Sequence, residues 1–428
     1  MNMRLSKLEN GLRVVTQRME HLETVSLGLW VGAGSRFEAE SEHGIAHLLE
    51  HMAFKGTTSR SARDIAEEIE YVGGDINAAT SAETTAYYAR TMKQDLPLGL
   101  ELIGDILINP TFDSDELKRE KNVIIQEISA ANDSPDDVIY DLAQQYAFPN
   151  QALGRSILGT AESVLSFNGD DLREFRDSRY SADSMVFSAS GALDHDEVVA
   201  RVGDRFGVLG SRTSPIAPKA VYRGGVCRSP LRFEQGHLLL AYEGPSYTSS
   251  DYYAAQVLSA ILGGGMSSRL FQEAREARGL CYAIYSFCWG VEDTGLFGVH
   301  AATAPDKYDE LLDVITAELA RMVETPPSKD ELTRAKAQLK AGLMVCLESS
   351  GARAEQLARQ TLAFGAPLAV ADMVAKVDSV SVEAVQFAAK KVFDGRPPTL
   401  ASVGPRDLDV EGQAWAHRLG ADAGLTAV

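Results

Sequence analysis

The sequence predicts an α+β protein of two homologous domains, each with helices packed on a mostly antiparallel sheet. The chain has 428 residues, more than one ordinary hydrophobic core accommodates. A stretch with two prolines, two glycines and little periodicity occupies residues 211–225. A short sequence and its flanking elements recur in the same order on both sides of this stretch. We therefore predict an N-terminal domain at 1–211, a linker at 212–225 and a C-terminal domain at 226–428.

The first half alternates β-prone runs with helical patterns. The dipeptide Asn10-Gly11 is typical of a hairpin turn between two short strands. Apolar and alternating runs predict strands, and charged amphipathic runs predict helices, one of them ended by glycines. We expect strands at 25–31, 75–82 and 84–92, and helices at 42–54, 62–72, 96–107 and 114–131.

The internal repeat indicates an ancestral duplication. The sequence DELKREK at 115–121 recurs as DELTRAK at 330–336, with five of seven residues identical. Gly74 and the strand after it recur as Gly279 and its strand. Each glycine is preceded by a charged helix and followed by two strands and a helix. Two matches in one order favour duplication over chance.

The two copies differ in their chemistry. Glu120 and Glu127 of the first copy correspond to Ala335 and Gly342 of the second, which also lacks a counterpart of the histidine-rich helix. Metal chemistry is therefore expected in the first half alone.

Composition excludes several classes of protein. The net charge of −19 disfavours a nucleic-acid partner. No run approaches the roughly 18 apolar residues of a membrane helix, and the N-terminus has no pattern of a secretory signal. The four cysteines form no C-x-x-C pair, so we expect reduced thiols rather than disulfides. These features favour a cytoplasmic protein without a membrane partner.

The segment from His47 to His51 carries the clearest chemical signal. His47 and His51 are four residues apart on a predicted helix, so both imidazoles leave one face about 6 Å apart along the axis. Such a pair can hold one Zn²⁺, and Glu50 lies where it can reach a water on the metal. The alternative is that the two histidines only cap or pack the helix.

A catalytic zinc ion needs a third protein ligand. Glu120 and Glu127 are seven residues apart and share one face of the predicted helix at 114–131. Spacing alone does not choose between them, and a solvated helix surface is the common role of glutamates.

The wider context has a family resemblance. The inverted zinc motif H-x-x-E-H lies in HGIAHLLEHMAFKGT at 43–57. Together with GGDINAATSAETTAYYA at 73–89 and ALGRSILGT at 152–160, it resembles the pitrilysin or insulinase family of zinc metallopeptidases, and most closely the processing-peptidase branch. The resemblance implies Glu127 as the third ligand of one Zn²⁺ per chain, with Glu120 as a supporting acid.

The resemblance also assigns residues of the second half. Family members that are active on their own carry an R-x6-Y pair, which Arg275 and Tyr282 match. The pair would stabilise the oxyanion of peptide hydrolysis. The alternative, from the residue types alone, is that Arg275 is an ordinary charge on a helix surface and Tyr282 a packed strand aromatic. The glycine run 263–265 lacks the pattern of a nucleotide-binding loop.

The strand at 75–82 is a candidate edge for substrate. An extended peptide can pair with an open sheet edge through backbone hydrogen bonds. The resemblance places Asn77 and Ala78 near the scissile bond, whereas composition is equally consistent with an internal strand.

These observations favour a zinc-dependent endopeptidase that acts on peptides or unfolded segments. Larger family members enclose substrate with four such domains, so the resemblance implies a homodimer in which Arg275 and Tyr282 complete the partner's zinc site. One alternative is a non-catalytic core or assembly subunit of the same fold. Another is a zinc enzyme acting on something other than peptides.

Overall fold

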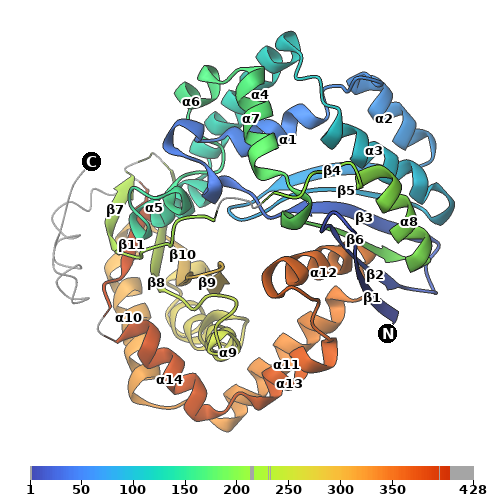
Figure 1. Ribbon diagram of the computed structural model, residues 1–428. Helices are drawn as coiled ribbons and strands as arrows, with labels where there is room; N and C mark the ends of the chain where they lie inside the picture. Colours follow the sequence, from blue (N-terminus) through green and yellow to red (C-terminus); the bar gives the residue numbers. More distant parts are fainter. Residues whose placement is uncertain (1, 213–215, 230, 232, 395, 405–428) are drawn as a thin grey trace. The chain divides into compact units, whose positions relative to one another are not determined.

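The computed structural model describes residues 2–212, 216–229, 231, 233–394 and 396–404 (Figure 1). The chain forms two compact units that do not follow chain order. Unit 1 contains Met1–Ser129, Ser156–Pro218 and Met344–Leu368, and unit 2 contains Ala130–Arg155, Lys219–Leu343 and Ala369–Val428. Each unit therefore takes one segment from the opposite half of the chain. The contiguous domains 1–211 and 226–428 stay a prediction, and residues 213–215 of the predicted linker lie outside the described residues.

The sheet of unit 1 has six strands in the order β1-β2-β6-β3-β5-β4, and all neighbours are antiparallel except the parallel pair β2–β6. The predicted hairpin is present, and Gly11 adopts the positive φ of 97° that its turn requires. The predicted strands are confirmed. The strand bounds are β1 (Asn2–Lys7), β2 (Arg13–Arg18), β3 (Thr24–Val31), β4 (Asp75–Thr80), β5 (Thr85–Met92) and β6 (Met185–Gly191).

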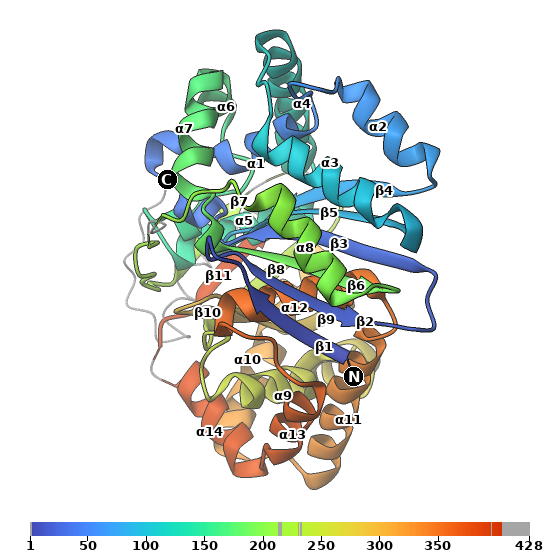
Figure 2. The ribbon, with the colours of Figure 1, turned by 45° about the vertical axis from the view of Figure 1, so that its right-hand side comes forward.

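Helices cover both faces of this sheet. Figures 1 and 2 show α3 and α12 on its opposite sides. Trp30 of β3 and Leu357 of α12 belong to one buried cluster, while Leu27 and Ile103 belong to the core on the other face. The helix bounds are α1 (Ile45–Ala53), α2 (Ala62–Tyr71), α3 (Leu96–Ile108), α4 (Ser114–Asn132), α6 (Ala161–Ser166), α7 (Gly169–Arg179), α8 (His195–Phe206) and α12 (Ser350–Phe364).

The helix predicted at 42–54 starts later than expected. A 3₁₀ turn spans Glu40–Glu42, and Gly44 then adopts φ 90°, so α1 begins at Ile45. A left-handed residue interrupts the helical dihedrals, and the local sequence pattern did not show this break.

The sheet of unit 2 has five strands in the order β7-β11-β8-β10-β9, again with a single parallel pair, β7–β11. Its strands are β7 (Gly225–Ser229), β8 (Gly236–Glu243), β9 (Cys281–Gly290), β10 (Gly295–Thr303) and β11 (Thr399–Val403). Its helices are α5 (Pro135–Ala147), α9 (Tyr252–Gly263), α10 (Tyr308–Glu324), α11 (Lys329–Cys346), α13 (Val370–Ser379) and α14 (Val382–Phe393).

The two units repeat one topology, which confirms the predicted class of two homologous α+β domains. Strands β2, β6, β3, β5 and β4 correspond in order to β7, β11, β8, β10 and β9, including the parallel pair. The duplication also exchanges a helix. The first-half helix α5 packs on the unit 2 sheet, and the second-half helix α12 packs on the unit 1 sheet.

Two further expectations concern cysteines and membrane spans. All four cysteines are free, as predicted. Within the described ranges, no helix combines the length and the apolar character needed to cross a membrane.

Candidate metal centre

The start of α1 is fixed by a buried carboxylate and two glycines. Glu38 accepts hydrogen bonds from the backbone N–H groups of Gly44 and Ala46, both at 2.9 Å, which satisfies amides that the first helical turn leaves unpaired. A Cβ on Gly44 would lie 2.7 Å from the Cα of Gly159, so the loop around 159 seats directly on the helix start. These contacts fix the position of α1 without the help of a metal ion.

The two histidines of α1 meet a glutamate of α4. The apolar face of α1 packs against α4 through residues such as Leu48 and Ile124. Glu127 Oε2 then lies 3.5 Å from His51 Nε2 and 3.8 Å from His47 Nε2. The side chains of His47 and His51 are largely buried, at 13% and 17% exposure, and Glu127 is 41% exposed. Three ligand atoms therefore converge at one partly open place.

Glu120, the second glutamate of α4, contacts the other ring nitrogen of His51. Glu120 Oε2 lies 3.0 Å from His51 Nδ1, and Lys55 Nζ lies 2.8 Å from Glu120 Oε1. Glu120 is buried, and its hydrogen bond holds the proton of His51 on Nδ1. This leaves the Nε2 lone pair facing His47 and Glu127.

Glu50 lies on the same helix and contacts the sheet. Thr80, at the end of β4, donates its hydroxyl hydrogen bond to Glu50 Oε2. Burial raises the pKa of the Glu50 carboxyl above its usual range, and the Thr80 hydrogen bond opposes that rise. Glu50 is thus a desolvated, oriented carboxylate one residue before a candidate ligand.

The donor set fits a catalytic zinc ion. Two imidazoles and one carboxylate form a known catalytic combination, in which a fourth position stays open. Burial and the neighbouring His51 lower the pKa of His47 to about 4, so its imidazole is neutral and has a lone pair to give. The Glu120–His51 hydrogen bond is the outer-sphere contact expected beside such a ligand.

Strand β4 lies at the edge of its sheet and separates two environments. It pairs with β5 on one side, and its residues alternate between the two faces. Ala78 is buried in the core, and Thr80 reaches Glu50. The predicted substrate residue Asn77 is exposed, and its Oδ1 accepts the Ala78 backbone N–H at 2.8 Å.

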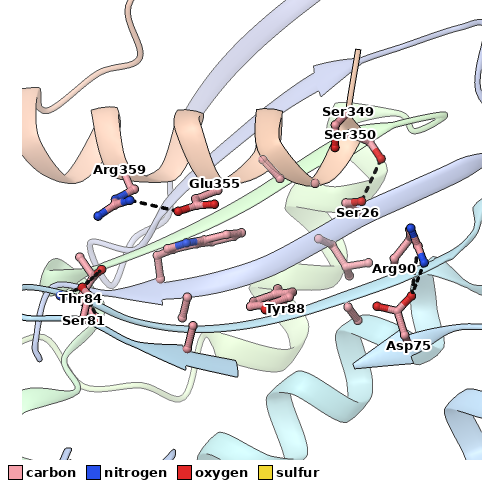
Figure 3. A pocket seen from close by; sticks show the side chains of 17 residues that line it. Ser26, Asp75, Ser81, Thr84, Tyr88, Arg90, Ser349, Ser350, Glu355 and Arg359 are labelled. Carbon is pink, nitrogen blue, oxygen red and sulfur yellow. Dashed lines mark hydrogen bonds and ion pairs between the residues drawn. The ribbon is translucent and has the colours of Figure 1, made fainter. Parts of the chain in front are cut away.

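The opposite face of β4 opens into a cavity of about 380 Å³. Asp75 and Ala79 of β4 line it, together with residues of β3, β5 and α12. Figure 3 shows α12 along one wall, with Glu355 and Arg359 as an ion pair, and Tyr88 on the strand side. The cavity therefore combines aromatic and charged surface beside an edge strand.

The predicted pair Arg275 and Tyr282 is brought together in unit 2. Arg275 lies in a π-helical turn, Phe271–Glu276, with its guanidinium carbon 5.3 Å from the centre of the Tyr282 ring. Tyr282 occupies a bulge of β9, because Cys281 pairs with Thr303 while Ala283 pairs with Ala302. The residue is 78% exposed, so the expectation of a packed strand aromatic does not describe it.

Sequence reasoning missed three residues that support the site. Thr80 orients Glu50, Glu38 caps α1, and Lys55 pairs with Glu120. The sequence contained a hint of the role of Lys55, because this residue follows His51 by four positions. Thr80 and Glu38 had none, because each acts on a partner brought near only by folding.

Comparisons with known proteins identify the family. Residues 13–161 match the family described as insulinase (peptidase family M16), and residues 166–339 match the description peptidase M16 inactive domain. An uncharacterized zinc protease of Streptomyces coelicolor is 38% identical over 411 residues, covering 94% of this chain and 89% of the relative. The uncharacterized zinc protease YmxG of Bacillus subtilis is 35% identical over 386 residues, covering 90% and 94%.

Solved structures share the fold. A protease from Helicobacter pylori superposes with a TM-score of 0.88 at 23% identity, covering 94% of this chain and 99% of that chain. A structure from Pseudomonas fluorescens, described as a peptidase M16 inactive domain, also has a TM-score of 0.88 at 23% identity, covering 95% and 98%. Sequence relatives and matched family regions agree with the resemblance predicted from the motifs, and the chain belongs to the insulinase family of peptidases, family M16.

Proposed function

We propose that this protein is a zinc-dependent endopeptidase. The observation that carries the proposal is the convergence of His47 Nε2, His51 Nε2 and Glu127 Oε2, with the desolvated carboxylate of Glu50 on the same helix. Relatives that share most of the chain are named zinc proteases, which supports the metal and the reaction class.

His47, His51 and Glu127 would hold one Zn²⁺. A bound Zn²⁺ supplies Lewis acidity, which polarises a peptide carbonyl and acidifies water. Thr80 occupies Glu50 Oε2, so Oε1 is the atom proposed to accept the proton of the attacking water. Glu50 then passes that proton to the leaving amine. Glu120 acts as a positioning residue, because it touches His51 and not the reacting atoms.

The peptide is proposed to add as a strand along β4. The Ala78 N–H, which now donates to Asn77 Oδ1, would donate to a substrate carbonyl instead. Because side chains of a strand alternate, one set would face the metal side and the next set would face the cavity beside α12. Backbone pairing accepts many sequences, and the cavity supplies selectivity.

Arg275 and Tyr282 are proposed to stabilise the oxyanion of a partner chain in a homodimer. Both are donors on irregular backbone, a π-turn and a bulge, which are frequent at functional sites. Mixing Glu50→Gln protein with Arg275→Ala protein tests the arrangement in trans. Heterodimers should recover one competent site, and demonstrated heterodimers without recovered activity would refute it.

The function itself is tested with Glu50→Gln. The variant should retain its metal by elemental analysis and lose about 10²–10⁴-fold in turnover of a peptide library. Glu40→Gln, an exposed residue shortly before α1, is the matched control and should keep full activity. A chelator should abolish wild-type cleavage, and Zn²⁺ should restore it. Normal cleavage by Glu50→Gln would contradict the assignment, and a metal-loaded wild type without cleavage would favour the non-catalytic subunit.

A further inference from the structure

Unit 2 contains a second convergence of metal-binding side chains. His237 on β8 and His300 on β10 lie on the sheet face that α5 covers. His300 pairs with Leu239, which is two residues from His237 and belongs to the same buried cluster as Ile139 of α5. Asp136, in the first turn of α5, reaches toward both. These residues, which we call the α5 triad, come from three elements that only the fold brings together.

The three ligand atoms form a nearly equilateral triangle. His237 Nδ1 lies 3.3 Å from Asp136 Oδ1, His300 Nε2 lies 3.5 Å from the same oxygen, and the two nitrogens are 3.4 Å apart. Ordinary N–H···O hydrogen bonds cluster at shorter lengths, about 2.7–3.2 Å. Ligands on a tetrahedral ion with bonds of about 2.0–2.1 Å are separated by about 3.3–3.4 Å, which is the spacing seen here.

The surroundings keep the imidazoles neutral and oriented. The side chains of His237 and His300 are 9% and 3% exposed. Burial lowers the pKa of both, that of His300 to about 4. The ring of His300 lies 5.7 Å from that of Tyr140 and 5.1 Å from that of Tyr285, and the two tyrosine hydroxyls are 2.8 Å apart.

The polar contacts of the His300 ring converge on the triad, which also has one side open to solvent. His300 Nδ1 is buried and has no hydrogen-bond partner in the described part of the chain, so the polar contacts of this imidazole are those of Nε2 with Asp136 and His237. Asp136 is 64% exposed, which gives an ion a path from solvent and leaves room for water in the remaining position.

We propose that Asp136, His237 and His300 bind a divalent transition-metal ion of the zinc class, separate from the centre on α1. Two imidazoles and one carboxylate suit Zn²⁺ and its first-row neighbours better than Mg²⁺ or Ca²⁺. Because Asp136 belongs to the first-half helix and the histidines to the second-half sheet, the ion would hold α5 on the unit 2 sheet. The chain then binds two ions, not the single one expected from sequence.

The competing explanation is a hydrogen-bonded triad without metal, in which Asp136 accepts from both rings. The test uses tag-free chain with His47→Ala and His51→Ala, so that the α1 centre no longer contributes. In equilibrium dialysis with Zn²⁺ as the probe, this protein should bind one ion per chain. Adding Asp136→Asn and His300→Gln should abolish that binding, whereas adding His21→Gln, an exposed histidine elsewhere, should leave it unchanged.

Thermal unfolding supplies an independent readout. Zn²⁺ should raise the melting temperature of the His47→Ala/His51→Ala protein and leave that of the quadruple variant unchanged. Should His300→Gln prevent folding, Asp136→Asn alone decides, because this residue is exposed and the change is isosteric; it should weaken Zn²⁺ binding at least about tenfold. Absence of Zn²⁺ binding by the His47→Ala/His51→Ala protein, or undiminished binding after Asp136→Asn, would overturn the proposal in favour of the hydrogen-bonded triad.

Discussion

Glu120 lies 3.0 Å from Nδ1 of His51, whereas Glu127 lies 3.5 Å from Nε2 of the same ring. The two glutamates of one helix thus contact opposite edges of one imidazole. Only the Nε2 edge also faces His47, so Glu127 is the glutamate positioned to bind the proposed zinc ion. Glu120 is positioned to fix the tautomer and the orientation of a ligand.

This difference predicts different losses on substitution. Glu127→Ala removes a ligand and should leave the α1 centre without zinc after dialysis. Glu120→Gln keeps all three ligands and should weaken zinc binding only about 10–100-fold, as other outer-sphere substitutions do. Competition with a chromophoric chelator measures both. To exclude the α5 triad from the count, both variants are made in an Asp136→Asn/His300→Gln background. Equal loss in the two variants would contradict the separation of roles.

Thr80 is predicted to position the carboxylate of Glu50, the proposed acceptor of the proton of the attacking water. Thr80→Val retains the shape and the β4 backbone but removes the donor to Glu50. The turnover number should fall about 10–100-fold, since a hydrogen bond to a charged group contributes about 1.5–3 kcal/mol. The Michaelis constant and the metal content should change little.

The control for Thr80 is its conservative replacement. Thr80→Ser keeps a hydroxyl at the same position and should restore most of the turnover. If Thr80→Ser is as slow as Thr80→Val, the hydroxyl is not the group that matters, and packing at the end of β4 is the better explanation.

Sequence predicted the parts of the site that depend on local periodicity. His47 and His51 share a face because a helix repeats every 3.6 residues, and the same rule placed Glu120 and Glu127 together. Periodicity could not rank the two glutamates, because the choice depends on how α4 packs on α1. Thr80 was out of reach for the same reason, since its partner belongs to another element.

The exchange of α5 and α12 between the repeats was also invisible in sequence. The strands and helices of each half were recognisable, but a helix pattern does not state which sheet its apolar face covers. The α5 triad depends on this exchange, because Asp136 reaches His237 and His300 only when α5 packs on the second sheet.

The pair Arg269 and Glu331 predicts how stability depends on pH. The hydrogen bonds from Arg269, at 2.6 and 3.1 Å, lower the pKa of Glu331 from 4.5 to about 2. A carboxyl whose folded pKa is depressed stabilises the fold above its unfolded pKa and loses that contribution as pH falls through the folded value. The stabilisation should therefore be complete above pH 4.5 and disappear toward pH 2.

Urea unfolding of Glu331→Gln checks this expectation. At about pH 7 the variant should be less stable than wild type by roughly 2 kcal/mol, and the difference should shrink at about pH 3. Glu9→Gln, at an exposed site, should show no such trend. A difference that stays constant with pH would mean that the lost packing, not the ion pair, causes the effect.

Tyr282 offers the clearest separation of activity from stability. The residue is 78% exposed in a bulge of β9, so removing its hydroxyl should leave the melting temperature unchanged. If the hydroxyl donates to the oxyanion, Tyr282→Phe should lower the turnover number about 10²-fold, the usual loss of one such donor. The phenylalanine ring keeps the contact with Arg275, whose guanidinium lies over it, so the loss would report the hydroxyl alone. Tyr71→Phe, at a 92% exposed position on α2, is the matched control and should behave as wild type. Full activity of Tyr282→Phe would show that this tyrosine is a surface residue after all, and the oxyanion would then depend on the metal and Arg275.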